Sequence, residues 1–184
     1  MSTPKINFTE GFTGFFDGWE SMRQAVGIYE TNVQIYAENL LRLHTGKTDL
    51  NRRYKEVLAC ILLAGQGASV LDLGGGLGVT YFAIKKYLNA PPPVDKWTVV
   101  DLPVIVNYGQ AQLADGRLQF TSPDQEPTFD IVLASHTMQY LADPYGTLRT
   151  LLAKRPRFVI FDELPLGDEV KYIVQKLPAS LGGS

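Results

Sequence analysis

One segment, VLDLGGGLG at residues 70–78, predicts the architecture of the chain around it. A short apolar run enters four glycines (Gly74, Gly75, Gly76 and Gly78), and an apolar helical pattern follows. Glycines at such a junction permit a tight turn and let a ligand approach the backbone. We therefore expect a buried strand, a ligand-binding turn at its carboxyl end, and the start of a helix. A tight strand–helix turn that binds nothing is the alternative.

Four more short apolar runs follow this segment and alternate with helical stretches. The expected strands are Ser69–Leu73, Trp97–Asp101, Leu118–Thr121, Asp130–Ala134 and Phe158–Asp162, and the expected helices cover about 78–89, 103–115 and 145–154. Such alternation is typical of a parallel sheet with helices on both faces. We therefore expect an α/β fold, a Rossmann-like doubly wound and mostly parallel sheet with the strand order 3-2-1-4-5.

The connection between the third and fourth strands restricts this order. Only residues 122–128 lie between them, and Pro123 and Pro127 exclude a helix there. A crossing of three strand positions needs ~22 Å, and eight extended links reach ~26 Å. The order is therefore feasible only with an extended crossing.

The first 66 residues differ in character. Residues 1–20 are rich in Gly and Phe, and their glycines interrupt any regular period. We expect this segment to cover the hydrophobic core, with a flap over a ligand pocket as the alternative. Helical spacing follows over 20–66, with a second helix from about Leu50 to Leu63 capped by Asp49. The expected domains are a cap-like portion, 1–66, and a Rossmann-like domain, 67–184.

Composition excludes several classes of function. The chain has 184 residues, 17 Lys and Arg against 19 Asp and Glu, a net charge of −2, one cysteine and two histidines. This balance lacks the footprint of a general nucleic-acid binder, and it excludes an internal disulfide, a cysteine-rich zinc module and a histidine-based metal site. No apolar run approaches the ~20 residues of a membrane helix, and no signal peptide is visible. We expect a soluble cytoplasmic protein without a metal.

Two carboxylates indicate which ligand the glycines hold. Asp101 ends the second strand, where a carboxylate accepts hydrogen bonds from a ribose diol, although it could also cap the helix that begins at Pro103. Asp72 would repel the pyrophosphate of a dinucleotide. It suits instead a cationic ligand such as S-adenosylmethionine, which carries an ammonium, a sulfonium and a ribose.

Four blocks of the sequence together resemble class I S-adenosylmethionine-dependent methyltransferases. The blocks are VLDLGGGLGV, WTVVDLP, FDIVLASHTMQYLADP and RFVIFDELPL, and they cover much of residues 69–166 in the family's order. The segment FTGFFDGWESM also resembles a little-characterised group of bacterial methyltransferase-like proteins that are often associated with surface-polysaccharide genes.

The resemblance implies roles for individual residues. Asp72 and the four glycines would hold the methionine portion of the cofactor, Asp101 its ribose and Leu102 its adenine. The adenine amino contact falls at Thr121, Ser122 or Asp124. Ser135 and His136 follow the fourth strand and would border the transferring methyl group.

Catalysis would need alignment of donor and acceptor and, for an oxygen acceptor, a base. His136 is the candidate base, with a structural histidine as the alternative. Related small-molecule O-methyltransferases place their base histidine where this chain has Gln139, which cannot act as a base. Either His136 replaces it, or Asp162 or Glu163 does, or the acceptor needs no base. Tyr140 could line the acceptor pocket or simply pack as a buried aromatic.

The C-terminal region differs from the family pattern. The family usually adds two strands after the fifth, whereas residues 167–177 look helical here. The fifth strand would then be an exposed apolar edge. We therefore expect a C-terminally truncated domain, or an oligomer, a partner or the chain's own C-terminal segment covering that edge.

Three functions compete. The first is methyl transfer from S-adenosylmethionine to a small-molecule or glycan-type acceptor. The second is a degenerate, non-catalytic protein that binds S-adenosylmethionine or S-adenosylhomocysteine. The third is an NAD(P)-dependent oxidoreductase, which Asp72 disfavours.

Overall fold

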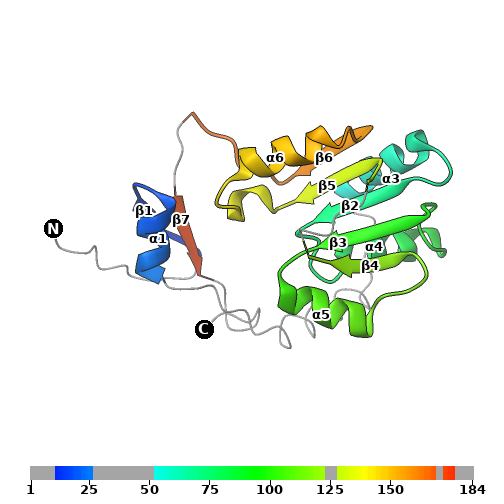
Figure 1. The fold of residues 1–184 in the computed structure, drawn as a ribbon, viewed down its shortest axis with the longest axis horizontal. Coiled ribbons are helices and arrows are strands. Elements are labelled where there is room, and N and C mark those ends of the chain that lie inside the picture. The colour runs from blue at the N-terminus through cyan, green and yellow to red at the C-terminus, as the bar shows by residue number, and fades with distance from the viewer. Residues whose placement is uncertain (1–10, 27–51, 123–127, 169–171, 177–184) are drawn as a thin grey trace. The chain divides into compact units, whose positions relative to one another are not determined.

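The computed structural model describes residues 11–26, 52–122, 128–168 and 172–176 (Figure 1). The chain divides into two compact units. The larger unit is Arg42–Pro165, and the smaller one combines Met1–Leu41 with Leu166–Ser184.

The larger unit is built on a five-stranded parallel sheet. Its elements are α3 (Arg52–Ala64), β2 (Ser69–Leu73), α4 (Val79–Leu88), β3 (Lys96–Val100), α5 (Pro103–Gln112), β4 (Leu118–Thr121), β5 (Ile131–Ser135), the 3-10 turn η2 (Met138–Tyr140), α6 (Pro144–Ala153) and β6 (Phe158–Asp162). The strands lie in the order β4-β3-β2-β5-β6, and all four pairings are parallel (Figure 1). Counted along the chain this is 3-2-1-4-5, so the predicted Rossmann-like sheet is confirmed.

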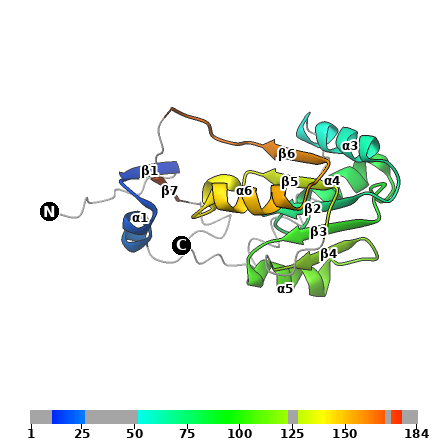
Figure 2. The same ribbon diagram turned by 45° about the horizontal axis from the view of Figure 1, so that its top comes forward.

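Successive side chains of a strand point to opposite faces of the sheet, so the strands contribute to two hydrophobic cores, one on each face. One core joins the sheet to α3 and α4 through Val70, Trp97, Leu118, Ile131, Ile61, Tyr81 and Ile84. The other joins the opposite face to α6 through Leu71, Val132, Ala134 and Leu151. Helices therefore cover both faces of the sheet, as Figure 2 shows in a second view.

The connection from β4 to β5 crosses three positions of the sheet. This is the crossing of three strand positions that the sequence argument assumed. Residues 123–127, and with them Asp124, lie outside the described residues.

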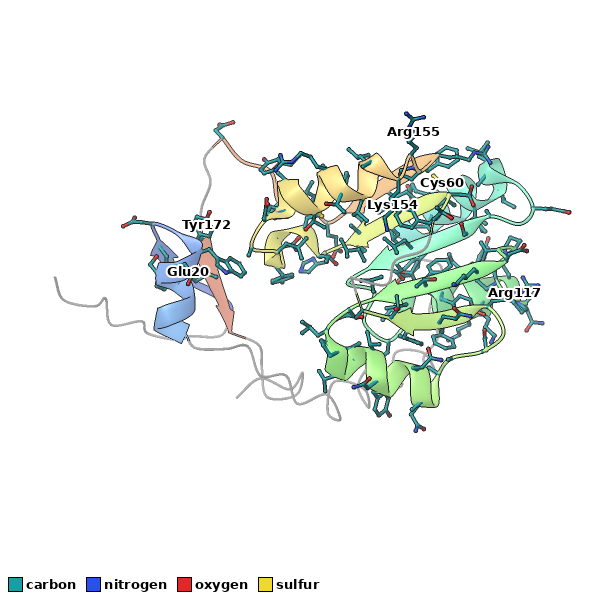
Figure 3. The ribbon with its side chains drawn as sticks, in the orientation of Figure 1. Glu20, Cys60, Arg117, Lys154, Arg155 and Tyr172 are labelled. Atoms are coloured by element: carbon teal, nitrogen blue, oxygen red, sulfur yellow. The ribbon has the colours of Figure 1, made fainter. Side chains whose placement is uncertain are left out.

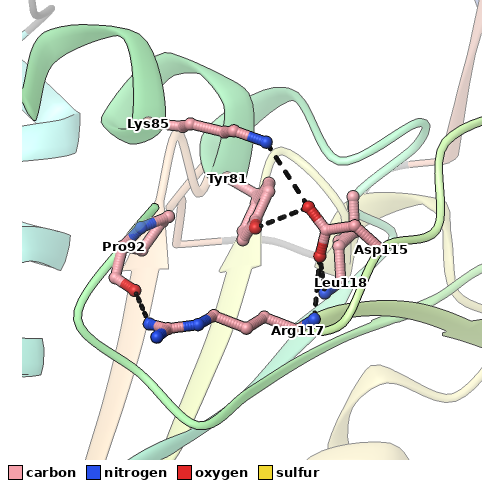
Figure 4. Close-up of polar contacts among 6 residues, drawn as sticks. All are labelled: Tyr81, Lys85, Pro92, Asp115, Arg117 and Leu118. Carbon is pink, nitrogen blue, oxygen red and sulfur yellow. Dashed lines mark hydrogen bonds and ion pairs between the residues drawn. The ribbon is translucent and has the colours of Figure 1, made fainter. Parts of the chain in front are cut away.

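A polar cluster fixes the amino end of β4 (Figure 4). The Oδ2 atom of Asp115 accepts hydrogen bonds from the Tyr81 hydroxyl at 2.9 Å and from Lys85 Nζ at 3.4 Å. Its Oδ1 atom accepts from the backbone N–H groups of Arg117 and Leu118, both at 2.8 Å. Burial, together with the neighbouring Asp115 carboxylate, raises the pKa of Tyr81 to about 12. This cluster anchors α4 against the sheet.

Basic side chains gather at this amino edge. Figure 3 shows Arg117 at the start of β4, and Lys154 and Arg155 at the end of α6. Carboxylates follow the strands at the opposite, carboxyl edge, where Asp101 follows β3 and Glu163 follows β6.

The smaller unit contains a two-stranded antiparallel sheet and one helix. Strand β1 (Gly11–Phe16) pairs with β7 (Tyr172–Lys176), and helix α1 spans Trp19–Val26. The register shifts between Thr13 and Phe15, which marks a bulge or irregularity.

Two sequence predictions are wrong here. Glycines do not prevent regular structure in the N-terminal segment, because β1 forms over residues 11–16 and contains its irregularity at a glycine. The helix expected over residues 167–177 is a strand at Tyr172–Lys176, where aromatic and β-branched residues favour extended backbone.

Helix α3 belongs to the larger unit, where it contacts α4, β5 and β6. Its range, Arg52–Ala64, agrees with the second predicted helix, whereas Asp49 and Leu50 lie outside the described residues. The chain thus divides before α3 rather than near residue 66, because the apolar side of this helix packs on the sheet.

Within the described parts of the chain, no helix has both the length and the apolar character needed to cross a membrane.

Candidate functional site

The glycine turn joins β2 to α4 in a conformation that only glycine adopts readily. Gly74, Gly76 and Gly78 have φ values of 65°, 58° and 78°. The N–H of Gly74 donates to the carbonyl of Val100 at 2.7 Å, so the turn is tied to the end of β3. Gly78 then caps α4. The backbone N–H groups of a helix start are thereby presented at the carboxyl edge of the sheet.

Close contacts also require glycine at two of these positions. A Cβ atom at Gly74 would lie 2.3 Å from Oγ1 of Thr137, and one at Gly75 would lie 2.5 Å from Cγ of Asp72. Thr137 is held in place because its hydroxyl lies 2.9 Å from the Leu73 carbonyl and 2.8 Å from that of Ser135. The turn is therefore packed from two sides by polar side chains.

Asp72 is the buried charge beneath this turn. Its side chain is 1% exposed, and its Oδ2 atom accepts a hydrogen bond from Trp97 Nε1 at 3.0 Å. Its Oδ1 atom is buried and has no hydrogen-bond partner among the described residues. Burial raises the pKa of Asp72 to about 7, the Trp97 hydrogen bond opposes this shift, and the Asp101 charge adds to it. A buried carboxylate in this state is stabilised by an approaching cation.

Asp101 links β3 to the glycine turn. Its Oδ2 atom accepts from the N–H of Gly76 at 2.9 Å, and its Oδ1 atom accepts from the N–H of Leu102 at 2.7 Å. Burial raises the pKa of this carboxyl group, and the two backbone hydrogen bonds oppose the shift. Each oxygen keeps a further lone pair for a ligand. Asp101 does not cap α5, because the cap position is Leu102 and no side chain caps this helix; the ribose contact stays a prediction.

The residues expected around an adenine follow the next strands. Leu102 is the N-cap residue of α5, and 51% of its surface is exposed. Thr121 ends β4 opposite Val100, and Ser122 follows it; both are half-buried. These residues share the carboxyl edge with Asp101, and their contact with a ligand stays a prediction.

The other half of the edge lies at β5 and β6. Ser135 and Asp162 are partners in the parallel register, and the Ser135 hydroxyl donates to Oδ2 of Asp162 at 2.9 Å. The Ser135 side chain is therefore engaged with β6, although its oxygen can still accept a hydrogen bond.

His136 stands between two side chains just beyond this pair. Its Nδ1 atom lies 2.9 Å from Oε2 of Glu163, and its Nε2 atom lies 3.2 Å from the Tyr140 hydroxyl. His136 and Glu163 both have φ of 53°, an uncommon conformation outside glycine. The structure thus brings together three residues that the sequence offered as separate candidates.

Gln139 has a buried Oε1 atom without a hydrogen-bond partner among the described residues. A buried unpaired amide oxygen is uncommon in folded proteins, and a ligand or water often supplies its partner. The Gln139 side chain can bind a hydrogen-bond donor but cannot take up a proton.

Sequence reasoning missed two residues of the site, Trp97 and Thr137. The register gives a signal for the first, since Trp97 pairs with Val70 and so lies on the same face as Asp72. The second packs on Gly74 from a turn after β5, and no local pattern predicts that contact.

Within the described ranges, no group of three or more His, Cys, Asp or Glu side chains could hold a metal ion.

No protein-family model and no curated protein matches this sequence. Several solved structures are similar to it. One is the protein in complex with the Haloferax volcanii Trm112 methyltransferase activator, at 19% identity and a TM-score of 0.46 over 67% of this chain and 55% of that chain. SAM-bound CalS10, an amino pentose methyltransferase from Micromonospora echinaspora, has 18% identity and a TM-score of 0.44 over 70% and 53% of the two chains.

The [4+2]-cyclase SpnF is similar to the same extent, at 16% identity and a TM-score of 0.44 over 68% of this chain and 55% of that chain. This chain spans about half the length of these three structures. The assignment of its fold rests on the strand order and the helical layers described above.

Proposed function

We propose that this chain is an S-adenosylmethionine-dependent methyltransferase that acts on a small-molecule or glycan-type acceptor. One observation carries the proposal: a buried carboxylate oxygen of Asp72 without a partner lies directly behind a glycine turn. A turn that served only to connect β2 to α4 would not need a buried charge there, because burying an unpaired charge is costly.

The residues present fit this cofactor. The negative charge of Asp72 favours a ligand with an ammonium and a sulfonium, and it opposes the pyrophosphate of NAD(P). Asp101 offers free lone pairs to a ribose, and the exposed Leu102 offers an apolar surface to an adenine. Thr121 or Ser122 would take the adenine amino group, and Ser135 borders the site on the side of β5.

The cofactor, when bound, supplies an activated methyl group that is lost as S-adenosylmethionine becomes S-adenosylhomocysteine. The contribution of this chain is to hold donor and acceptor in line and to manage the proton of an oxygen acceptor. We assign to His136 the uptake of this proton, since its imidazole already contacts a carboxylate and a hydroxyl.

A second function is favoured by one observation. Gln139 replaces the base histidine of related O-methyltransferases, which is what a non-catalytic protein that binds S-adenosylmethionine or S-adenosylhomocysteine would show. Methyl transfer separates the two functions, because only the enzyme converts the cofactor.

Calorimetric titration with S-adenosylhomocysteine tests the binding site, with NAD as the control ligand. We expect the wild-type chain to bind S-adenosylhomocysteine and not NAD, and Asp101→Ala to weaken binding at least tenfold. Asp168→Asn, which changes an exposed carboxylate, is the matched control and leaves the affinity unchanged. Binding of NAD alone, or no binding by a chain with a cooperative unfolding transition, would refute the proposal.

A further inference from the structure

The imidazole of His136 bridges an acid and a phenol. Its Nδ1 atom faces the Glu163 carboxylate at 2.9 Å, and its Nε2 atom faces the Tyr140 hydroxyl at 3.2 Å. A carboxylate only accepts hydrogen bonds, so Nδ1 carries a proton. In the neutral imidazole Nε2 is then the acceptor, and the Tyr140 O–H donates to it.

The strand register and the backbone conformation bring these groups together. His136 is the first residue after β5 and Glu163 the first after β6, and their predecessors Ser135 and Asp162 are register partners. The N–H of His136 donates to the Asp162 carbonyl at 2.9 Å. Both residues adopt a φ of 53°, and strain of this kind in non-glycine residues concentrates at functional sites.

The three side chains are open to a ligand from the solvent side. The side chains of His136 and Glu163 are 48% and 50% exposed, and Tyr140 is 48% exposed. The adjacent Thr137 packs on Gly74, so this trio belongs to the same carboxyl edge as the glycine turn. The Tyr140 hydroxyl already makes the hydrogen bond to Nε2 of His136. An acceptor that approaches this edge would therefore contact Tyr140 as well as His136.

We infer that Tyr140 is the residue that meets a hydroxyl acceptor and passes its proton to His136; the inference rests on the proposed function. The acceptor O–H donates to the Tyr140 oxygen while the Tyr140 proton moves to Nε2. Tyr140 ends with the number of protons it began with, and His136 gains one opposite the Glu163 carboxylate. S-adenosylmethionine, when bound, would supply the methyl group that replaces this proton, and the imidazolium would carry the positive charge that the cofactor gives up. Tyr140 is then the catalytic residue, and His136 and Glu163 act through it.

Nitrogen-15 NMR of the imidazole tests the arrangement without an acceptor. The chain has two histidines, so His136→Gln assigns the signals by leaving only those of His44. We expect neutral His136 to favour the Nδ1–H tautomer about tenfold, because its partner is a charged acceptor. Tyr140→Phe shifts the Nε2 signal and leaves Nδ1 protonated, whereas Glu163→Ala removes the preference and Glu163→Gln partly restores it.

Tyr145→Phe is the matched control, since Tyr145 is 70% exposed at the start of α6. It leaves both nitrogen signals unchanged. A dominant Nε2–H tautomer, or an Nε2 signal that does not respond to Tyr140→Phe, overturns the inference. The proposed function fails separately, if S-adenosylhomocysteine does not bind.

Methyl transfer from labelled S-adenosylmethionine to paired probes tests the proton path. The pairs are phenol with aniline and cyclohexanol with cyclohexylamine. We expect transfer to the hydroxyl members and about a 100-fold loss in Tyr140→Phe, with affinity for S-adenosylhomocysteine within twofold of wild type. Transfer to the probes at an equal rate in Tyr140→Phe overturns the inference while leaving the enzyme assignment intact.

Discussion

The two halves of the carboxyl edge achieve their shape in opposite ways. At β2 and β3, every positive φ of the turn falls on a glycine, and the carboxylates of Asp72 and Asp101 are drawn into the fold. At β5 and β6, positive φ falls on His136 and Glu163, and their side chains remain half exposed.

We interpret the half at β2 and β3 as the part that binds the ligand and the half at β5 and β6 as the part that takes part in the reaction. Glycine enters the left-handed region without a steric penalty, whereas other residues pay about 1 kcal/mol or more. The first half is therefore a backbone cradle that exists before a ligand arrives. In the second half the backbone is strained, and this conformation places His136 between Glu163 and Tyr140.

We expect the largest effect on stability from a substitution at Gly74 in the glycine turn. In Gly74→Ala the new Cβ atom meets Thr137 at 2.3 Å and the residue keeps a φ of 65°. We expect the free energy of unfolding to fall by about 4 kcal/mol, measured by urea denaturation. Gly116→Ala, where nothing lies within 4 Å of the new atom, stays within about 0.5 kcal/mol. Equal losses in the two variants would show that the crowding at Gly74 is relieved by small movements.

Asp72→Asn is expected to strengthen the fold and weaken the site. The folded pKa of about 7 lies above the ordinary value of 3.8, so the folded chain holds a proton that the unfolded chain releases. The stability from this group is full below pH ~4 and is lost as the pH rises through 7. At pH 8 we expect the variant to be more stable by roughly 3 kcal/mol and to lose affinity for S-adenosylhomocysteine.

Thermal unfolding from pH 4 to pH 8 measures this effect. The difference between Asp72→Asn and wild type should grow from pH 4 to about pH 7 and then level off. A constant difference across the range would contradict the burial of a titrating carboxyl group at this position.

His136→Gly tests the strain in the second half. Removing the side chain from a φ of 53° should raise the free energy of unfolding by about 1 kcal/mol. Arg155→Gly is the matched control, since Arg155 has φ of 56° at the amino edge. We expect a similar gain in both variants, and loss of methyl transfer only in the first. A loss of stability in His136→Gly alone would mean that its side-chain contacts outweigh the strain.

The smallest effect on stability is expected from the exposed ion pair. Glu163→Gln removes a charge from a pair whose side chains are 48% and 50% exposed. Such pairs contribute little, so urea denaturation should detect a change below about 0.5 kcal/mol. A loss of several times that size would identify Glu163 as a structural residue.

The sheet was predictable because its strands are short apolar runs, each followed by a glycine or a polar residue. Ser69–Leu73, Leu118–Thr121 and Phe158–Asp162 occur in the structure with the predicted bounds. The ribbon β1–β7 was not predictable, because its two strands are far apart in the sequence and neither has a clear alternation. Extended structure there depends on a partner that local pattern does not identify.

The candidate site was also predictable only in part. Positions that come directly after a strand, such as Asp101 and His136, were predictable, since parallel strands end at one edge. The partners of these residues were not. Trp97 reaches Asp72 through the lateral register, and Tyr140 reaches His136 through the turn η2, so both contacts depend on side-chain directions.

The pairing of β1 with β7 has a consequence for how the protein forms during synthesis. The two strands enclose the whole larger unit between them in the sequence, so their pairing closes a very long loop. During translation β1 leaves the ribosome first and has no partner until Tyr172–Lys176 is made. The parallel sheet is complete in sequence before that point, and domains generally fold as they emerge. The smaller unit therefore forms last, and for most of the synthesis of the chain β1 has exposed strand edges.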